Sequence, residues 1–304
     1  MIDGNIRTNS ENEFAETAEG FDNNTALKAK LYLCATPIGN MGDITKRVES
    51  TLANCDAIFC EDTRNTRSLL EKLGIKGKRL YAAHTHNEQA AAEKIAELVR
   101  EGSAVAYVSD AGMPGISDPG ERIVRHFIEQ GLEFEVLPGA SASLTAAILS
   151  GLPTRRVYFV GFLPRENKER AEFIAELKRV SATIVIYESP YRVADTLEEL
   201  KRLLGDRQAA VSREITKHFE QTVRGSLSEL AERFAKEPPK GECVITTAGK
   251  TEDDEAQTES LDDMLLRLLE GGMSAKDAAK QAALMLDMPK SEAYERATEL
   301  KNSK

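Results

Sequence analysis

Long apolar runs are absent from this sequence of 304 residues, although 41% of the residues are hydrophobic. No run approaches the roughly 20 residues that a helix needs to cross a bilayer. The chain also has no basic segment followed by an apolar core near its start, as a secretory signal would. We therefore expect a cytoplasmic protein with no membrane partner, folded as one large or two medium domains.

Spacings typical of metal sites are also missing. The chain has four cysteines and four histidines, and no close Cys/His pair has the spacing of a zinc site. Apolar, strand-like runs contain three of the cysteines, so buried and reduced thiols are expected. We predict no metal.

Common glycine-rich fingerprints are absent too. The sequence contains no G-x-G-x-x-G after a strand, no G-x-x-x-x-G-K-[ST] and no G-x-S-x-G. These absences exclude the usual dinucleotide-binding, P-loop and nucleophile-elbow proteins, and the common methyltransferase loop is not seen either.

What the sequence does contain is an alternation of short apolar runs with amphipathic segments. Residues 1–29 are polar and predict a disordered tail. From Lys30 the alternation predicts βαβ units and a mostly parallel sheet, in an N-terminal α/β domain over residues 30–151. The expected strands are Leu31–Ala35, Ala57–Cys60, Leu80–Ala82, Ala104–Ser109 and Phe134–Leu137, with helices over Thr66–Leu73 and Asn87–Arg100.

A second α/β domain is expected over residues 155–250, after a linker at Leu152–Thr154. Two of its strands, Ala209–Arg213 and Gln221–Arg224, have no helix between them, which predicts an antiparallel hairpin in a mixed sheet. The other expected strands are Val157–Gly161, Thr183–Tyr187 and Cys243–Thr247.

An acidic linker, Thr251–Glu259, precedes a helical module over residues 260–304. Ser260 and Ser274 each begin a capping-box pattern, and Pro289 suits the first turn of a third helix. Two interpretations stay open: a helix-turn-helix-like module, or a helical hairpin that packs on the rest of the protein.

Three loops rich in glycine and proline follow expected strands of the first domain. Ligands bind at the carboxyl ends of parallel strands, so these loops predict one shared crevice. Glycine lets the backbone approach a ligand closely, although each loop taken alone is also compatible with a simple turn. The loops are TPIGNMGD from Thr36, SDAGMPGISDPG from Ser109 and PGASA from Pro138.

The order of the motifs TPIGN, EDTR, SDAGMPGISDPG, PGASA, GFLPR, YESPYR, REITK and GEC resembles the ribosomal RNA small subunit methyltransferase I family, a branch of the tetrapyrrole methylases. The resemblance covers about Leu31 to Gly249. Met113 departs from it, because a threonine is expected there. The resemblance implies two α/β domains with S-adenosylmethionine in the cleft between them, and it implies a homodimer. The reaction that it implies is 2′-O-methylation of a cytidine in the decoding region of 16S rRNA.

Methyl transfer from a sulfonium is an in-line displacement that depends on positioning. On this interpretation Asp110 accepts from the cofactor's ammonium or ribose, backbone N–H groups near Met113 and Ser141 hold its polar ends, and Tyr187 closes over the adenine side. Local turn stabilisation is the alternative for each residue. The candidate cofactor-binding residues are Pro37, Gly39, Asp110, Gly112, Met113, Ser141, Ala142 and Tyr187.

A ribose hydroxyl needs help to lose its proton. Asp62 is a candidate base, Arg64 a candidate phosphate contact, and Lys217 a candidate for lowering the hydroxyl's pKa or, if desolvated, for accepting its proton. An ordinary network of salt bridges is the alternative.

The net charge of −10 is unusual for a protein that binds RNA, because phosphate contacts normally need basic residues. Basic residues do gather in and beside the motifs, which favours recognition of 16S rRNA by shape within an assembled small subunit. They are Arg64, Arg67, Arg155, Arg156, Arg165, Lys168, Arg170, Arg192, Arg213 and Lys217.

Two other functions stay open at this point, because a fold does not fix a substrate. One is methylation of a tetrapyrrole or another small substrate. The other is a non-catalytic module that binds RNA or an assembly factor.

Overall fold

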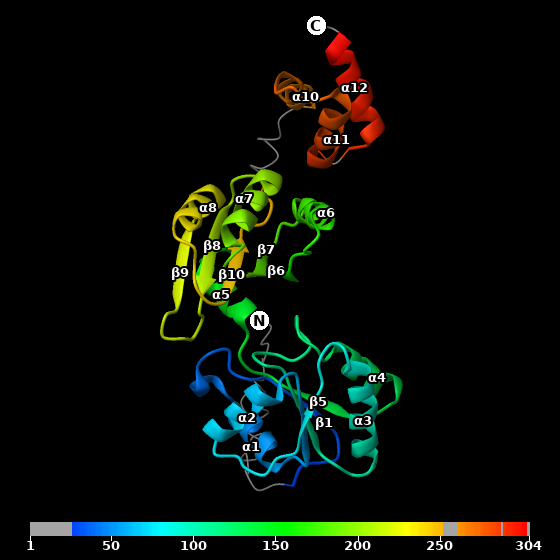
Figure 1. The fold of residues 1–304 in the computed structure, drawn as a ribbon, viewed down its shortest axis with the longest axis vertical. Coiled ribbons are helices and arrows are strands. Elements are labelled where there is room, and N and C mark those ends of the chain that lie inside the picture. Colours follow the sequence, from blue (N-terminus) through cyan, green and yellow to red (C-terminus); the bar gives the residue numbers. More distant parts are fainter. Residues whose placement is uncertain (1–25, 252–260, 287, 303–304) are drawn as a thin grey trace, which may run out of the picture. The chain divides into compact units, whose positions relative to one another are not determined.

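The computed structural model describes residues 26–251, 261–286 and 288–302, and within these the chain forms two compact units that divide between Ser141 and Ala142 (Figure 1). The predicted tail falls almost wholly outside the described residues. So do most of the acidic linker and the capping box at Ser260.

A five-stranded parallel sheet, in the order β3-β2-β4-β1-β5, forms the centre of the first unit. Every residue of β1, β2 and β4 is buried, as expected of parallel strands covered on both faces. The prediction of a parallel sheet is confirmed. The strands are β1 (Leu31–Cys34), β2 (Ala57–Cys60), β3 (Leu80–Ala82), β4 (Val105–Val108) and β5 (Phe134–Leu137).

Helices cover both faces of this sheet (Figure 1). On one face Leu52 and Leu70, from α1 and α2, pack with Ile58 of β2. On the other, Ile95 and Phe127, from α3 and α4, belong to the cluster around β1 and β4. The helices are η1 (Met41–Asp43), α1 (Lys46–Asn54), α2 (Thr63–Lys72), α3 (Glu88–Arg100) and α4 (Glu121–Glu129).

Helix α2 begins three residues earlier than its apolar pattern predicts. The side chain of Asp62 accepts a hydrogen bond from the backbone N–H of Arg64 at 2.8 Å and so satisfies a donor in the first turn. At the other end Gly74 has φ +73°, the left-handed conformation expected just past a helix, as predicted.

A mixed five-stranded sheet, in the order β6-β7-β10-β8-β9, forms the centre of the second unit. Strands β6 and β7 are parallel, β10 is antiparallel to β7 and β8, and β8 and β9 form the predicted antiparallel hairpin. Consequently β6, β7 and β8 all end at the same edge of the sheet. The strands are β6 (Val157–Phe162), β7 (Thr183–Glu188), β8 (Gln208–Arg213), β9 (Gln221–Ser226) and β10 (Cys243–Thr247).

Three helices cover one face of this second sheet, and their apolar residues share a core cluster with Ile184, Val211 and Ile245. They are α6 (Asn167–Leu177), α7 (Val193–Leu204) and α8 (Leu227–Lys236). Helix α5 (Ala142–Ser150) packs against β7, β8 and β10 through small buried residues, among them Ala146 and Ala147. This segment is predicted to belong to the N-terminal domain over residues 30–151, whereas its contacts in the structure are with the second sheet.

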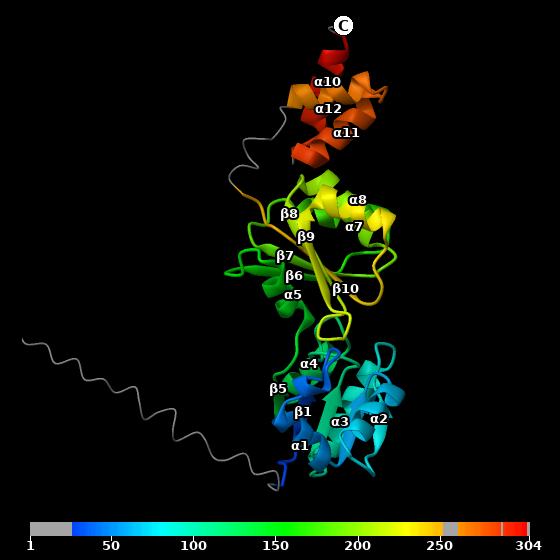
Figure 2. The same ribbon diagram turned by 90° about the vertical axis from the view of Figure 1, so that its left-hand side faces the viewer.

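The C-terminal module contains α10 (Leu261–Glu270), α11 (Ala275–Leu286) and α12 (Lys290–Asn302), which pack against one another in both Figure 1 and Figure 2. The predicted capping pattern at Ser274 is present, because the backbone N–H of Asp277 donates to its hydroxyl at 3.2 Å. Pro289 lies immediately before α12 rather than in its first turn.

All four cysteines are free and buried, as predicted for reduced thiols. Burial raises the pKa of both Cys55 and Cys243 to about 11, so these thiols are poor nucleophiles at neutral pH. Among the described residues, no helix is long and apolar enough to cross a membrane.

Candidate functional site

The three loops predicted to converge do meet at the carboxyl ends of β1, β4 and β5. Thr36 and Gly112 exchange two backbone hydrogen bonds, of 2.9 and 3.0 Å, which join the first loop to the second. Gly112 adopts φ +76°, a conformation that favours glycine. In the third loop, a Cβ on Gly139 would lie 2.7 Å from the Cβ of Ala35, so only glycine allows this approach.

A pocket of about 250 Å3 opens beside these loops. Three predicted cofactor-binding residues, Pro37, Gly39 and Asp110, line it. The volume is below the roughly 300 Å3 at which typical small-molecule sites begin, so we expect this pocket to receive part of a ligand. Its lining residues are Thr36, Pro37, Gly39, Met41, Asn65, Thr66, Ser68, Leu69, Lys72, Ser109 and Asp110.

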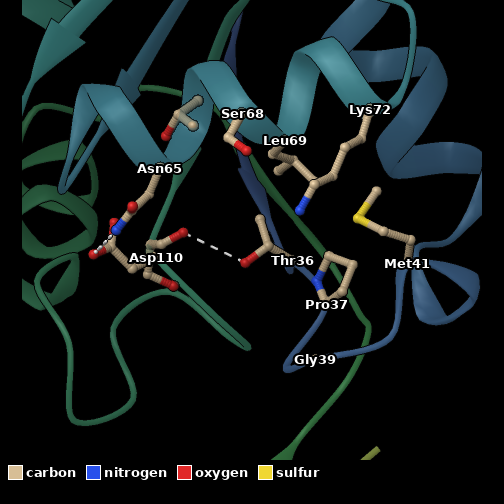
Figure 3. Close-up of a pocket in the computed structure, with 11 residues that line it drawn as sticks. Thr36, Pro37, Gly39, Met41, Asn65, Ser68, Leu69, Lys72 and Asp110 are labelled. Atoms are coloured by element: carbon tan, nitrogen blue, oxygen red, sulfur yellow. Dashed lines mark hydrogen bonds between the residues drawn. The ribbon is translucent and has the colours of Figure 1, made fainter. Parts of the chain in front are cut away.

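One wall of the pocket comes from α2, and its residues are not among the predicted cofactor-binding residues. Figure 3 shows the side chains of Asn65, Ser68, Leu69 and Lys72 extending from this helix, with Thr36 and Pro37 on the facing loop. These four helical positions are spaced three and four residues apart, the spacing of one helix face. That spacing is a signal in the sequence, but only the fold shows which face meets the loops.

Asp110 links the second loop to the start of α2. Its Oδ2 accepts from the side-chain amide of Asn65 at 2.8 Å, and its Oδ1 accepts from the backbone N–H of Asp62 at 3.2 Å. The residue remains exposed. A carboxylate has about four lone-pair sites, so Asp110 keeps acceptor capacity for a ligand.

Two further carboxyl groups, Glu61 and Asp118, lie near Asp110 and were not among the predicted site residues. Burial, followed by the charges of Glu61 and Asp110, raises the pKa of Asp118 to about 6. Burial and the charge of Asp110 also raise the pKa of Glu61. Both residues belong to motifs that stand out in the sequence, EDTR and the second Ser-Asp pair, but their proximity depends on how β2 and the β4 loop fold.

Asp62 and Arg64, two of the predicted catalytic residues, form an ion pair of 2.6 Å at the start of α2. The side-chain and backbone hydrogen bonds from Arg64 lower the pKa of Asp62 to about 2. A carboxylate with so low a pKa is a weak base at neutral pH. The Arg64 side chain is 86% exposed, so it is accessible to an anionic partner despite the ion pair.

Lys217, the third predicted catalytic residue, lies in the second unit between β8 and β9. Its ammonium lies 3.0 Å from Glu214 and 2.7 Å from Glu242. Burial works against the charged form, but the hydrogen bonds to Glu242 and Glu214 outweigh it and raise the pKa of Lys217. The side chain is therefore a protonated cation in this arrangement, not a base.

The remaining predicted cofactor-binding residues do not line the pocket. Gly112 uses its N–H and C=O in the pair with Thr36, and Met113 is half-buried. Ser141 ends the first unit, and Ala142 begins α5. Tyr187 of β7 is the last of these predicted residues. Its ring makes edge contacts with the rings of Phe159 and Phe162, at centroid distances of 4.9 and 5.6 Å.

One member of the predicted basic surface is corrected by the structure. Arg170 is only 8% exposed and is paired inside the second unit with Glu188 and Glu199, so it is not available to phosphate.

The described residues hold no group of three or more His, Cys, Asp or Glu arranged as a metal site.

Comparison with known proteins places this geometry in a class. Residues 30–231 match the family of tetrapyrrole (corrin/porphyrin) methylases, and residues 254–301 match the RsmI C-terminal HTH domain. Similar solved structures include the native uroporphyrin III C-methyl transferase of Thermus thermophilus, with a TM-score of 0.52, 19% identity, and 71% of this chain and 96% of that chain covered. The methyltransferase CobJ has a TM-score of 0.56 at 18% identity, with 72% and 94% covered. The fold is that of a tetrapyrrole methylase.

Curated relatives narrow the class. Ribosomal RNA small subunit methyltransferase I of Halalkalibacterium halodurans is 41% identical over 88% of this chain and 94% of its own length. The proteins of the same name from Bacillus subtilis and Synechocystis are 40% and 39% identical, over 87% and 89% of this chain and 92% and 98% of their own lengths. This chain belongs to the family of ribosomal RNA small subunit methyltransferase I.

Proposed function

We propose that this protein transfers the methyl group of S-adenosylmethionine to the 2′-hydroxyl of a cytidine ribose in the decoding region of 16S rRNA. The observation that carries the proposal is the sequence identity of about 40% to relatives named as ribosomal RNA small subunit methyltransferase I, over nearly their whole length. The pocket at the strand ends of the first unit supports it, because parallel sheets bind their ligands there.

The residues of this pocket suit the cofactor. S-adenosylmethionine carries positive charge on its sulfonium and ammonium groups, and when bound it supplies an activated methyl group. The carboxyl groups of Glu61, Asp110 and Asp118 create a negative potential beside the pocket. Asp110 keeps free lone pairs for an ammonium or a ribose hydroxyl, and Gly39 lets the backbone come close.

The rest of the cofactor contacts are proposed from the family resemblance. Gly112 and Met113 shape the second loop, while backbone groups at Ser141 and Ala142 hold a polar end of the cofactor. Tyr187 closes over its adenine side. Methyl transfer then depends on holding the donor and acceptor in line.

The two cations among the predicted catalytic residues act on the RNA in this proposal. Arg64, which is 86% exposed, binds a phosphate. Protonated Lys217 stabilises negative charge that develops on the ribose oxygen. Asp62 positions Arg64 and caps α2. It is not the base in this proposal, because its lowered pKa leaves it a weak proton acceptor.

The partner in this proposal is 16S rRNA within an assembled small ribosomal subunit in the cytoplasm, and the enzyme is a homodimer. A chain with net charge −10 attracts naked RNA weakly, whereas local arginines and lysines can read a folded surface.

Mass spectrometry of 16S rRNA tests the proposed function. RNA from cells that lack the gene should lose one 2′-O-methyl mark on a cytidine of the decoding region. Restoring the gene should return the mark. Purified enzyme should then methylate small subunits from the deletion strain with labelled cofactor. An unchanged rRNA methylation pattern in the deletion strain would contradict the proposal.

The cofactor site has a separate test. Asp110→Ala should weaken S-adenosylmethionine binding by about tenfold or more, because a charge-assisted hydrogen bond is worth about 1.5–3 kcal/mol. Its melting temperature should change little, since the residue is exposed. Calorimetry measures the affinity, with Asp195→Ala on α7 as the matched control. Wild-type affinity in Asp110→Ala would remove Asp110 from the cofactor site.

A further inference from the structure

A buried carboxylate, Glu188 at the end of β7, organises the turn that follows it. Its side chain has no exposed surface. Oε1 accepts from the backbone N–H of Ser189 at 2.7 Å and pairs with Arg192 at 2.7 Å. Oε2 accepts from the hydroxyl of Thr196 at 2.7 Å and lies 3.5 Å from Arg170. A buried charge is tolerated when it is paired and hydrogen-bonded in this way.

Arg170 extends this network across three elements. From α6 it donates to Thr196 of α7 at 2.6 Å and to Glu199 of α7 at 2.6 Å, while it also faces Glu188 of β7. Removing one partner of such a network leaves the others buried and unpaired, which is costly. The turn from Ser189 to Arg192 is therefore held by side chains at both of its ends.

This fixed turn presents a fully solvated aromatic ring. Tyr191 is 91% exposed, the highest value among the large hydrophobic side chains described as exposed. Phe162, at the end of the neighbouring strand β6, is 58% exposed and contacts the ring of Tyr187, its register partner. Strands β6 and β7 are parallel, so these rings gather at one edge of the sheet.

The surroundings of this edge indicate how it binds. The exposed cations Arg165 and Lys168 follow β6, but Glu166 and Glu169, also exposed, alternate with them. In the segment that follows β6, these exposed cations and anions therefore balance. A rigidly held ring recognises a partner chiefly through its flat face, and in single-stranded RNA that partner is an unstacked base.

We propose that Tyr191 stacks on an unpaired nucleobase of the substrate RNA, and that Glu188 is the positioning residue that holds the Tyr191 turn ready for it. This inference rests on the proposed function, since it names a contact with the same RNA. A nucleotide whose 2′-hydroxyl must be methylated has to be held still, and a stacked base at this edge would restrain it.

Steady-state methylation of small ribosomal subunits tests the inference. Tyr191→Ala should raise KM for subunits about 5- to 150-fold, the range that corresponds to stacking one base on an aromatic ring. Tyr191→Phe should stay near wild type, because it keeps the ring, and Tyr191→Leu should remain impaired. Cofactor affinity and melting temperature should be unchanged in all three. Tyr158→Ala, which removes a 43% exposed tyrosine near the start of β6, is the matched control.

Glu188→Gln tests the positioning role. The readout is KM for subunits in the single and double variants, because a loss of stability alone would not make the two changes non-additive. Glu188→Gln should raise KM for subunits, and adding Tyr191→Ala should raise KM no further, because both changes remove the same contact. Wild-type KM in Tyr191→Ala, full recovery in Tyr191→Leu, or additive effects in the double variant would overturn the inference. Failure of the wild-type enzyme to methylate subunits would instead overturn the proposed function.

Discussion

At the scale of single residues, the site shows one amino acid in contrasting environments. Asp62 lies against a guanidinium and has a pKa of about 2, whereas Asp118 is partly buried beside Glu61 and Asp110 and has a pKa of about 6. Hydrogen bonds to a charged form lower a carboxyl pKa, and burial beside like charges raises it. Neighbours, not residue type, decide the pH at which each of these groups loses its proton.

The Asp62–Arg64 pair leads to a comparison of two variants. Asp62→Asn keeps a good helix cap but breaks the ion pair, so it should reduce methylation no more than Arg64→Ala does. Loss of a true general base would cost about 100-fold or more. Single-turnover methylation of subunits measures both variants, and a loss of that size in Asp62→Asn alone would make Asp62 the base.

Asp118→Asn should stabilise the protein near neutral pH and not in acid. Folded Asp118 keeps its proton up to about pH 6, above its ordinary value of 3.8, so the stability linked to that proton is present below pH 4 and is lost as the pH rises through 6. Asparagine avoids this loss. We expect a gain of about 1 kcal/mol at pH 7.5, after allowance for solvent screening, and little at pH 4.

Thermal unfolding at the two pH values measures this effect. Glu135→Gln is a control of opposite sign, because the hydrogen bond from Lys30, together with its charge, lowers the pKa of Glu135. That variant should lose stability at pH 7.5, where the Glu135 carboxylate is charged and paired. Equal changes at both pH values for Asp118→Asn would contradict the expected linkage.

At the scale of elements, three loops approach one another closely at the strand ends beside the pocket. The Thr36–Gly112 pair joins the β1 and β4 loops, and Gly139 brings the β5 loop against Ala35 at the end of β1. Small residues at such a contact keep the strand ends together. The shape of the pocket therefore depends on a few backbone positions as well as on its lining side chains.

Gly139→Ala should loosen this arrangement, because the new Cβ would lie 2.7 Å from that of Ala35. We expect a loss of about 1–3 kcal/mol in stability, as in other overpacked sites, and weaker cofactor binding. In the Ala35→Gly/Gly139→Ala double variant the colliding Cβ is removed, and part of both losses should return. Thermal unfolding and calorimetry measure the cycle, and a double variant no better than Gly139→Ala would show that this contact is not the cause.

At the scale of the whole molecule, the net charge of −10 and the proposed RNA substrate lead to a prediction about substrate form. The enzyme should methylate intact small subunits faster than deproteinised 16S rRNA at matched concentration and salt. Rising salt should weaken the RNA step and leave cofactor binding largely intact. Equal rates on the two substrates would contradict recognition of a folded surface.

Charge reversal extends this prediction to one residue. Arg64→Glu should cost subunit methylation far more than cofactor affinity, because phosphate contacts fix a protein on RNA without touching the cofactor. Arg125→Glu on α4, which changes a similarly exposed arginine outside the pocket lining, is the matched control. Equal losses of cofactor affinity and methylation in Arg64→Glu would argue against a phosphate contact.

The sequence by itself determined the elements that depend on local pattern. The bounds of β2, β3, β5 and β10 agree with the predicted runs, and the β8–β9 hairpin follows from the lack of a helix between its strands. Motif order alone was enough to indicate the family. These features are readable because hydrophobic periodicity and turn residues act over a few positions.

Only the tertiary structure decided which side chains meet. It assigned α5 to the second sheet, brought Glu61 and Asp118 beside Asp110, placed one face of α2 along the pocket, and paired Arg170 internally. Each of these outcomes joins residues far apart in the chain, and each charge state depends on burial and on neighbours that no local pattern contains. The pKa of Asp118 and the fixed turn of Tyr191 are therefore properties of the folded chain.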